Sequence, residues 1–232
     1  MKKKLQIIGI IIVVLIGSFF GLYKLMNSRT YQVAGTLVNK VETNEKVVYL
    51  TFDDGPTKET DRILQALKEL DIKATFFLIG SNIEKHTEEA KSILAQGHAI
   101  GNHTYSHNRM VFKSPSFIQE EIDKTNDIIK EIGYTDEILF RPPYGKKLVM
   151  LPLYLDEVSQ TTVMWDIEPE SYEEVNKDAK SIANHVIDNV QNGSIILLHP
   201  MNDKTDKTID AIKQIVLTLK EQGYSFEVLP TS

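Results

Sequence analysis

Short apolar segments alternate with longer segments of helical periodicity along most of this chain. The alternation is typical of parallel strands joined by helices, because a helix must carry the chain back before the next strand can run in the same direction. Strands are predicted at residues 47–52, 74–79, 99–102, 137–140, 161–165, 194–198 and 224–229, and helices at 59–70, 83–96, 114–132, 177–190 and 205–221. We therefore predict an α/β fold with about seven parallel strands and outer helices.

The length of the alternating region limits its architecture. A closed barrel of eight strand–helix units typically needs about 250 residues, and residues 46–232 fall well short of that. A distorted, incomplete (β/α) barrel is the expected arrangement. The region carries no internal repeat or composition break, so residues 46–232 are predicted to be a single domain.

The N-terminus has the pattern of a membrane segment. Three lysines follow Met1, an apolar run extends from Leu5 to Leu22, and Lys24 closes it. About 20 residues cross a bilayer, and basic residues remain on the cytoplasmic side. No small-residue cleavage site follows, so we predict an uncleaved transmembrane helix over residues 1–26 with its N-terminus inside; a cleaved signal peptide is the alternative. Residues 27–45 read as an extracytoplasmic tether with one short strand at 32–38.

Composition excludes several classes of function. The 26 Lys and Arg residues against 32 Asp and Glu give a formal net charge of −6, and no nucleic-acid-binding motif is present, so we expect no nucleic-acid partner. The chain has no Cys, which excludes disulfides and thiolate metal ligands.

Polar side chains follow five of the predicted strands, at the carboxyl end in each case. These groups are Asp53-Asp54, the segment 103–107, the segment 141–144, the segment 166–168 and His199-Pro200. A (β/α) barrel brings the carboxyl ends of its strands to one face, which is where active sites of such folds lie. The five groups are therefore predicted to form one site.

Two histidines within this set have a spacing suited to a metal. His103 and His107 are four residues apart, so on a helical turn both imidazoles lie on one side. With one strand-end carboxylate they make a three-ligand site with open positions, the pattern of catalytic zinc. A lone pair of this kind is often a surface feature, and the nearby carboxylates are what favour a metal site. Three other histidines, His86, His98 and His185, are expected to be structural or solvated.

Four ordered motifs resemble those of the polysaccharide deacetylases, the NodB-homology family or carbohydrate esterase family 4. They are Thr51-Phe52-Asp53-Asp54-Gly55, His103-Thr104-Tyr105-Ser106-His107, Arg141-Pro142-Pro143-Tyr144 and Leu197-Leu198-His199. The resemblance covers about residues 46–229. It implies a distorted (β/α) barrel that removes acetyl groups from N-acetylated sugars of peptidoglycan or chitin, or from acetylated xylan.

The resemblance also implies roles for individual residues. Asp54, His103 and His107 would hold the metal, with Zn²⁺ expected and Co²⁺, Ni²⁺ or Mn²⁺ as alternatives. Such a metal lowers the pKa of a bound water and polarises the acetyl carbonyl. Asp53 would be the general base and His199 the general acid.

Further residues are implied to orient the reacting groups. Arg141 would orient Asp53, and the backbone N–H of Tyr144 would bind the oxyanion. The substrate-binding set is Pro143, Tyr144, Trp165 and Leu197, in which Trp165 and Leu197 would line the pocket of the acetyl methyl group; ordinary core packing is the alternative for these two.

The sequence departs from the family after Trp165. The family commonly has Asp-x-x-Asp-Trp there, and this chain has Glu168-Pro169-Glu170-Ser171-Tyr172. Glu168 is expected to tether Arg141 with a longer arm, and Tyr172 to replace the tryptophan. Ser171 cannot replace the second carboxylate, so substrate preference and rate depend on how this segment folds.

Other functions fit parts of the pattern. Two histidines and one carboxylate also hold non-haem iron, and a glycosidase needs two carboxylates on opposite sides of a bond, which the adjacent Asp53 and Asp54 do not offer. The non-enzyme alternative is a membrane-tethered cell-wall-binding protein that kept the fold. The expected partners are a cell-wall glycan and, through the N-terminal helix, the membrane; the expected location is outside the cytoplasm, secreted if the N-terminal segment is cleaved.

Overall fold

A computed structural model describes residues 2–201 and 205–231. The strands are β1 (Leu37–Val38), β2 (Val47–Gly55), β3 (Thr75–Leu78), β4 (Ala99–Asn102), β5 (Thr162–Val163), β6 (Ile195–Leu198) and β7 (Ser225–Phe226). The helices are α1 (Lys2–Asn27), α2 (Thr60–Glu69), α3 (Gly80–Lys85), α4 (Thr87–Ala95), α5 (Pro115–Glu131), α6 (Met150–Glu157), α7 (Ala179–Asn189) and α8 (Thr205–Glu221), with 3-10 turns η1 (Pro143–Gly145) and η2 (Pro169–Ser171).

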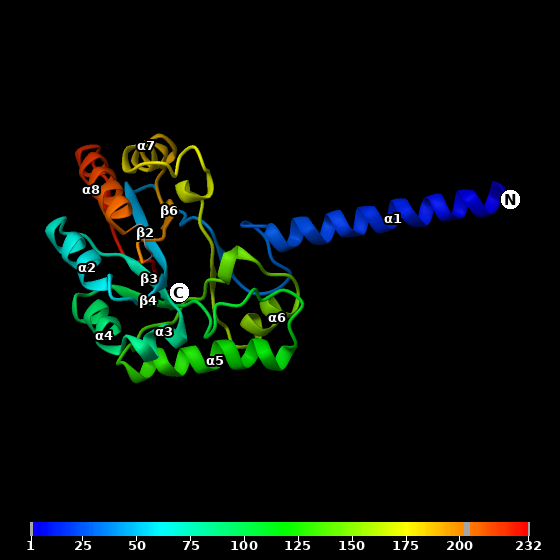
Figure 1. Cartoon of the computed structure of the whole chain (residues 1–232), viewed down its shortest axis with the longest axis horizontal. Coiled ribbons are helices and arrows are strands. Elements are labelled where there is room, and N and C mark those ends of the chain that lie inside the picture. The colour runs from blue at the N-terminus through cyan, green and yellow to red at the C-terminus, as the bar shows by residue number, and fades with distance from the viewer. Residues whose placement is uncertain (1, 202–204, 232) are drawn as a thin grey trace.

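The main sheet is parallel, as the alternation of elements predicts. Its strand order is β4-β3-β2-β6, with β7 paired to the start of β2, and β1 pairs in parallel with β5. The helices lie around the outside of the strands (Figure 1). The α/β prediction is therefore confirmed.

Single residue pairs, not full strands, continue this sheet toward β5 and back to β6. Phe140 bridges both Asn102 and Thr162, and Ile167 bridges Ile196. The predicted strand at residues 137–140 is thus wrong except at Phe140, because the side chain of Gln160 donates to the Ile138 carbonyl at 2.8 Å and takes that acceptor out of the ladder.

Strand β2 separates two apolar layers. Its residues Val48, Leu50 and Phe52 pack in the large core between sheet and helices, whereas Val47 and Tyr49 belong to a second cluster with Trp165 and Leu197. Because successive strand residues face opposite sides, Thr51 and Asp53 share the side of Val47 and Tyr49. The alternation therefore directs Asp53 into the interior of the incomplete barrel.

The predicted helices are present, with one correction. The helix predicted at residues 83–96 is two helices, α3 and α4, that meet at His86, whose φ of −131° and ψ of 49° are not helical. Helix α5 begins as predicted, since the Ser114 hydroxyl accepts from the Phe117 N–H at 3.2 Å and Pro115 takes the first position, where no N–H is needed.

The segment predicted as a tether is packed on the domain. Helix α1 extends away from the domain in Figure 1, but the chain after it pairs with the sheet through β1, and the Met164 N–H donates to the Val38 carbonyl at 2.7 Å. Of the strand predicted at residues 32–38, only Leu37 and Val38 are a strand. Little free linker separates α1 from the domain.

Candidate metal centre and active site

The two acids at the end of β2 face one cavity because the strand bulges there. The register of β2 with β3 shifts between Asp53 and Gly55, and the extra residue, Asp54, has a φ of 75°. A bulge re-aims the side chain that it carries. Without it, adjacent carboxylates would point to opposite faces; with it, both line the same cavity.

The two histidines are brought together by a loop and not by the helical turn expected from their spacing. Thr104 and His107 both have positive φ values, 65° and 57°. Side chains hold this shape: the side-chain amide oxygen of Asn102 accepts from the Thr104 N–H at 2.7 Å, and the Thr104 hydroxyl accepts from the His107 N–H at 3.1 Å. The imidazole centroids lie 5.0 Å apart.

Asp54, His103 and His107 can hold one metal ion. One ligand atom from each lies within 4.8 Å of the others. His107 Nε2 is 3.1 Å and His103 Nε2 3.6 Å from Asp54 Oδ1, an oxygen that is buried and has no hydrogen-bond partner among the described residues. The donor set of two nitrogens and one oxygen is that of catalytic zinc sites, so these residues fit the ion.

Hydrogen bonding orients the His103 ring. Its Nδ1 lies 2.8 Å from the Arg141 carbonyl oxygen, which can only accept, so Nδ1 carries a proton and Nε2 is the nitrogen that faces Asp54. Burial raises the pKa of the Asp54 carboxyl, but the two imidazoles beside it and the charges of His103 and His199 outweigh burial and lower that pKa far below its ordinary value. Asp54 is therefore an anion, as a carboxylate ligand of a metal must be.

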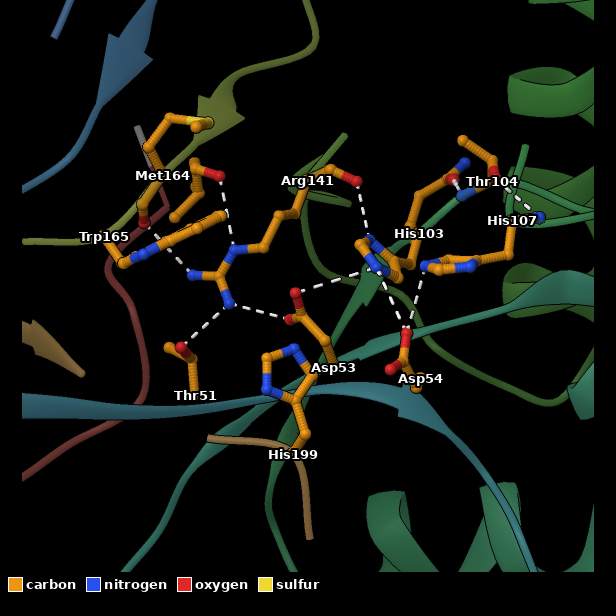
Figure 2. A network of polar contacts seen from close by, with 12 residues as sticks. Thr51, Asp53, Asp54, His103, Thr104, His107, Arg141, Met164, Trp165 and His199 are labelled. Atoms are coloured by element: carbon orange, nitrogen blue, oxygen red, sulfur yellow. Dashed lines mark hydrogen bonds and ion pairs between the residues drawn. The ribbon is translucent and has the colours of Figure 1, made fainter. Parts of the chain in front are cut away.

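Arg141 binds Asp53 in the interior of the domain. Its Nη1 donates to Asp53 Oδ1 at 2.8 Å and to the Thr51 hydroxyl at 2.9 Å, while Nη2 and Nε donate to the carbonyls of Met164 and Val163 (Figure 2). Arg141 is 0% and Asp53 3% exposed. Arg141 binds only one oxygen of Asp53, so the second oxygen, Oδ2, faces His103 Nε2 at 3.6 Å.

His199 has a carboxylate partner that the sequence interpretation missed. Its Nδ1 donates to Oε2 of Glu170 at 2.8 Å, so Nε2 is the nitrogen left for the cavity. Burial lowers the pKa of His199, but Glu170 and Asp53 outweigh it and raise that pKa to about 9. Glu170 stands one residue before Ser171, and its longer side chain supplies the carboxylate that Ser171 lacks.

The cavity has a volume of about 580 Å³. It is lined by Asn27, Arg29, Asp53, Asp54, His103, His107, Tyr144, Gly145, Lys146, Trp165, Glu168, Ser171, Leu197 and His199. Most residues predicted for the site are thus together. Pro143 and Arg141 are not in the lining; both are buried.

Glu168 does not make the predicted contact with Arg141. Among the described residues its carboxylate pairs with Arg29 at 2.6 Å and accepts from Trp165 Nε1 at 2.9 Å. The backbone carbonyls of Val163 and Met164 occupy the donors of Arg141 that Glu168 was expected to bind. Glu168 acts on Arg141 only through its charge.

This parallel α/β fold carries three histidines, several carboxylates and a buried arginine at its strand ends, and two of the histidines with one carboxylate form the donor set of metal-dependent hydrolases. The chain belongs to the polysaccharide deacetylase family, which it matches over residues 40–164. It is 38% identical to a peptidoglycan-N-acetylglucosamine deacetylase of Bacillus cereus, over 81% of this chain and 68% of that protein. It is 35% identical to the peptidoglycan-N-acetylmuramic acid deacetylase PdaC of Bacillus subtilis, over 79% of this chain and 38% of that protein.

Solved structures agree with the family. A peptidoglycan N-acetylglucosamine deacetylase in complex with 4-naphthalen-1-yl-N-oxidanyl-benzamide superposes with a TM-score of 0.78 and 36% identity, over 84% of this chain and 91% of the other. A pseudoenzyme of carbohydrate esterase family 4 from Bacillus anthracis superposes with a TM-score of 0.75 and 28% identity, over 85% and 68% of the two chains. Members of this fold therefore include an enzyme and a pseudoenzyme.

Proposed function

We propose that this chain is a metal-dependent N-deacetylase of cell-wall glycan, with Zn²⁺ as the expected metal. The observation that carries the proposal is the joint presence, in one cavity, of the three candidate ligands, a second carboxylate and a histidine with its own acidic partner. The net reaction adds water to the N-acetyl amide and releases acetate and a free amine.

Asp54, His103 and His107 would hold the ion, which when bound supplies a water of lowered pKa and a positive charge for the acetyl carbonyl. Asp53 is the general base, because its free oxygen faces this centre while Arg141 keeps the other oxygen bonded at 2.8 Å. A fixed base needs no reorganisation before it takes the proton of the water.

His199 is the general acid. Its Nδ1 proton is held by Glu170 and its raised pKa keeps the ring protonated at neutral pH, so Nε2 can deliver a proton to the leaving sugar nitrogen. The backbone N–H of Tyr144, which has a φ of 58° in the turn η1, is the donor assigned to the oxyanion. Trp165 and Leu197 offer the small apolar surface for the acetyl methyl group.

The substrate is a peptidoglycan strand, by analogy with relatives named for N-acetylglucosamine and for N-acetylmuramic acid. Chitooligosaccharides carry the same N-acetyl group and are the second substrate to test. One described helix, with a span of Lys3–Asn27 and a mean hydropathy of 2.6 over its most apolar 18 residues, has the length and composition to cross a membrane. We assign it as an anchor that holds the domain outside the cytoplasm; a cleaved signal is the alternative.

Acetate release from purified peptidoglycan and from chitooligosaccharides tests the proposal. The full chain should release acetate from at least one of them, lose that activity with a chelator and regain it with Zn²⁺. An Asp54→Ala variant that keeps full turnover would contradict the proposed role of the metal.

The pseudoenzyme relative supports a second candidate, a wall-binding protein without turnover. Binding to purified peptidoglycan that survives Asp54→Ala, together with no acetate from the parent chain, would favour this candidate. The complete set of reactive groups in one cavity favours the enzyme.

A further inference from the structure

The segment that follows α1 is a wall of the active-site cavity. Asn27, the last residue of α1, and Arg29 both line that cavity. The Lys146 ammonium, in the loop just after the turn η1, donates to the Asn27 side-chain oxygen. The membrane helix therefore ends inside the lining of the site.

Arg29 is bound to two residues of the site. Its guanidinium lies 4.6 Å from the ring centre of Trp165 and pairs with Glu168 at 2.6 Å, and Glu168 also accepts from the Trp165 indole N–H. Stacking and a shared carboxylate hold Arg29 against the wall that faces the acetyl group.

A buried lysine fastens the same segment from below. Lys147 is 1% exposed, its ammonium donates to the Ser28 carbonyl, and its backbone N–H donates to the Met26 carbonyl at 3.3 Å. Residues 26–29 are thus clamped, and the end of α1 has no flexible joint to the domain.

The length of α1 then fixes how far the cavity lies from the membrane. The apolar run from Leu5 to Leu22, together with Tyr23 and the closing Lys24, has about the 20 residues needed to span the hydrocarbon core. At a rise of 1.5 Å per residue, Asn27 is only about 5 Å further along the helix than Lys24. This distance is less than the thickness of the headgroup region, so the cavity wall lies at the membrane surface.

A second observation agrees with this position. Helix α6 lies on the side of the domain toward which α1 extends (Figure 1). Its residues Met150 and Leu153, and Val149 before it, are 41%, 45% and 38% exposed. Apolar side chains are stable there if they contact the interfacial layer of the bilayer.

From these contacts we infer that the active site works at the membrane surface, on N-acetylated glycan that is held there by a lipid, and not on mature wall beyond its reach. This inference rests on the proposed deacetylase function and on the assigned anchor. The contacts that clamp residues 26–29 onto the domain make the end of the anchor helix part of the active-site wall.

The test uses the full chain in anionic phospholipid vesicles and one N-acetylchitotetraose in two forms, free in solution and linked to a lipid in the same vesicles. The parent should favour the lipid-linked form by about tenfold or more in kcat/KM, because its cavity and substrate share one surface. Equal kcat/KM for the two forms would overturn the inference and leave the deacetylase proposal standing. No acetate from either form would overturn both.

Two variants separate clamping from mere anchoring. A 20-residue Gly-Ser insertion after Lys24 leaves the clamp of residues 26–29 on the domain and lets the domain move away from the membrane. It should lower the preference for the lipid-linked form by about fivefold and leave turnover of the free form unchanged. A full preference in this variant would overturn the inference.

The second variant, Leu153→Glu, places a charge against the anionic surface. It should lower turnover of the lipid-linked form by about threefold or more and spare the free form. The matched control is Leu217→Glu on α8, whose side chain is 59% exposed and which should change neither rate. Equal behaviour of the two variants would contradict membrane contact at α6.

Discussion

Oε2 of Glu170 accepts two hydrogen bonds from one residue, His199: from Nδ1 at 2.8 Å and from the backbone N–H at 2.7 Å. The other oxygen of Glu170 accepts from the Thr208 hydroxyl at 3.2 Å. The carboxylate is therefore fixed by three donors, and it fixes both the tautomer and the charge of His199. The pKa of about 9 follows, because Glu170 and Asp53 together outweigh the effect of burial.

Glu170→Gln should shift the alkaline limb of the pH–rate profile of kcat/KM to lower pH. Since a general acid must be protonated, activity falls as pH rises through its pKa. Loss of the Glu170 charge lowers the pKa of His199, so the variant should lose activity at a pH where the parent keeps it. Initial rates of acetate release between pH 5 and 10 provide the measurement.

The control for this prediction is Glu173→Gln, an exposed acid of the same segment, which should leave the profile unchanged. A Glu170→Gln profile that superposes on the parent profile after scaling would contradict the assigned role, since a purely structural effect lowers the rate equally at every pH.

The same pair should make stability depend on pH. The pKa of His199 is raised in the folded chain above its ordinary 6.5, so its contribution is full below about pH 6.5 and is lost as pH rises through 9. In metal-free protein the free energy of unfolding should fall over this window by on the order of 3 kcal/mol. Urea unfolding at pH 6 and pH 9 measures the difference, which Glu170→Gln should reduce; an undiminished difference in that variant would contradict the pairing.

Much of this site follows from sequence alone. Asp53 and Asp54 come at the end of one apolar strand, and His103 follows another. The carboxyl ends of parallel strands meet on one face of the fold. Local pattern was enough to place these side chains together, because the sheet that carries them is built from short-range strand and helix signals.

What the pattern did not predict depends on side-chain reach and on backbone conformations of positive φ. Glu170 and His199 are 29 residues apart in the sequence, and Arg29 and Glu168 are 139 apart, so local pattern does not pair them. The left-handed backbone of Asp54 and His107 replaces the expected strand and helical geometry. A carboxylate one residue before the departure at Ser171 was the one available signal for Glu170.

Asp54→Asn should abolish zinc binding and leave the fold intact. Oδ1 of Asp54 is the oxygen shared by both imidazoles, and an amide gives up the negative charge that the ion requires. The parent should bind one Zn²⁺ per chain and gain about 2.7 kcal/mol of stability at a free zinc concentration 100 times the dissociation constant. Calorimetry and thermal unfolding with and without Zn²⁺ measure both effects.

The matched control is His86→Asn, since His86 lies between α3 and α4 and pairs with Glu89, outside the site. This variant should keep full zinc stoichiometry. One equivalent of tightly bound Zn²⁺ in Asp54→Asn would exclude this site as the metal centre.

Arg141→Lys should destabilise the domain although it keeps the charge. The guanidinium makes four bonds in a fixed fork, to Asp53, to Thr51 and to two carbonyls, and an ammonium cannot satisfy all of them. Buried acceptors left unpaired cost about 1–3 kcal/mol each. We expect a loss of about 2–4 kcal/mol in the free energy of unfolding and a lower kcat.

Arg62→Lys is the comparison for that variant. Arg62 is exposed and pairs with Glu59 at the surface, where ion pairs contribute little. Its free energy of unfolding should stay within about 0.5 kcal/mol of the parent value. Equal stability for the two lysine variants would show that the buried fork of Arg141 is not needed.

Gly145→Ala should damage the site through Trp165. Gly145 has a φ of +64°, and a Cβ there would stand 2.8 Å from Cη2 of the Trp165 ring, so the ring or the turn must shift. The left-handed conformation costs an alanine about 1–2 kcal/mol.

Gly133→Ala is the matched control, because Gly133 has a φ of +102° and no atom within 4 Å of its added Cβ. Both variants should lower the melting temperature, but only Gly145→Ala should lower kcat/KM, by about tenfold for a misplacement near the reacting groups. Equal kcat/KM in the two variants would remove Trp165 from the wall that positions the substrate.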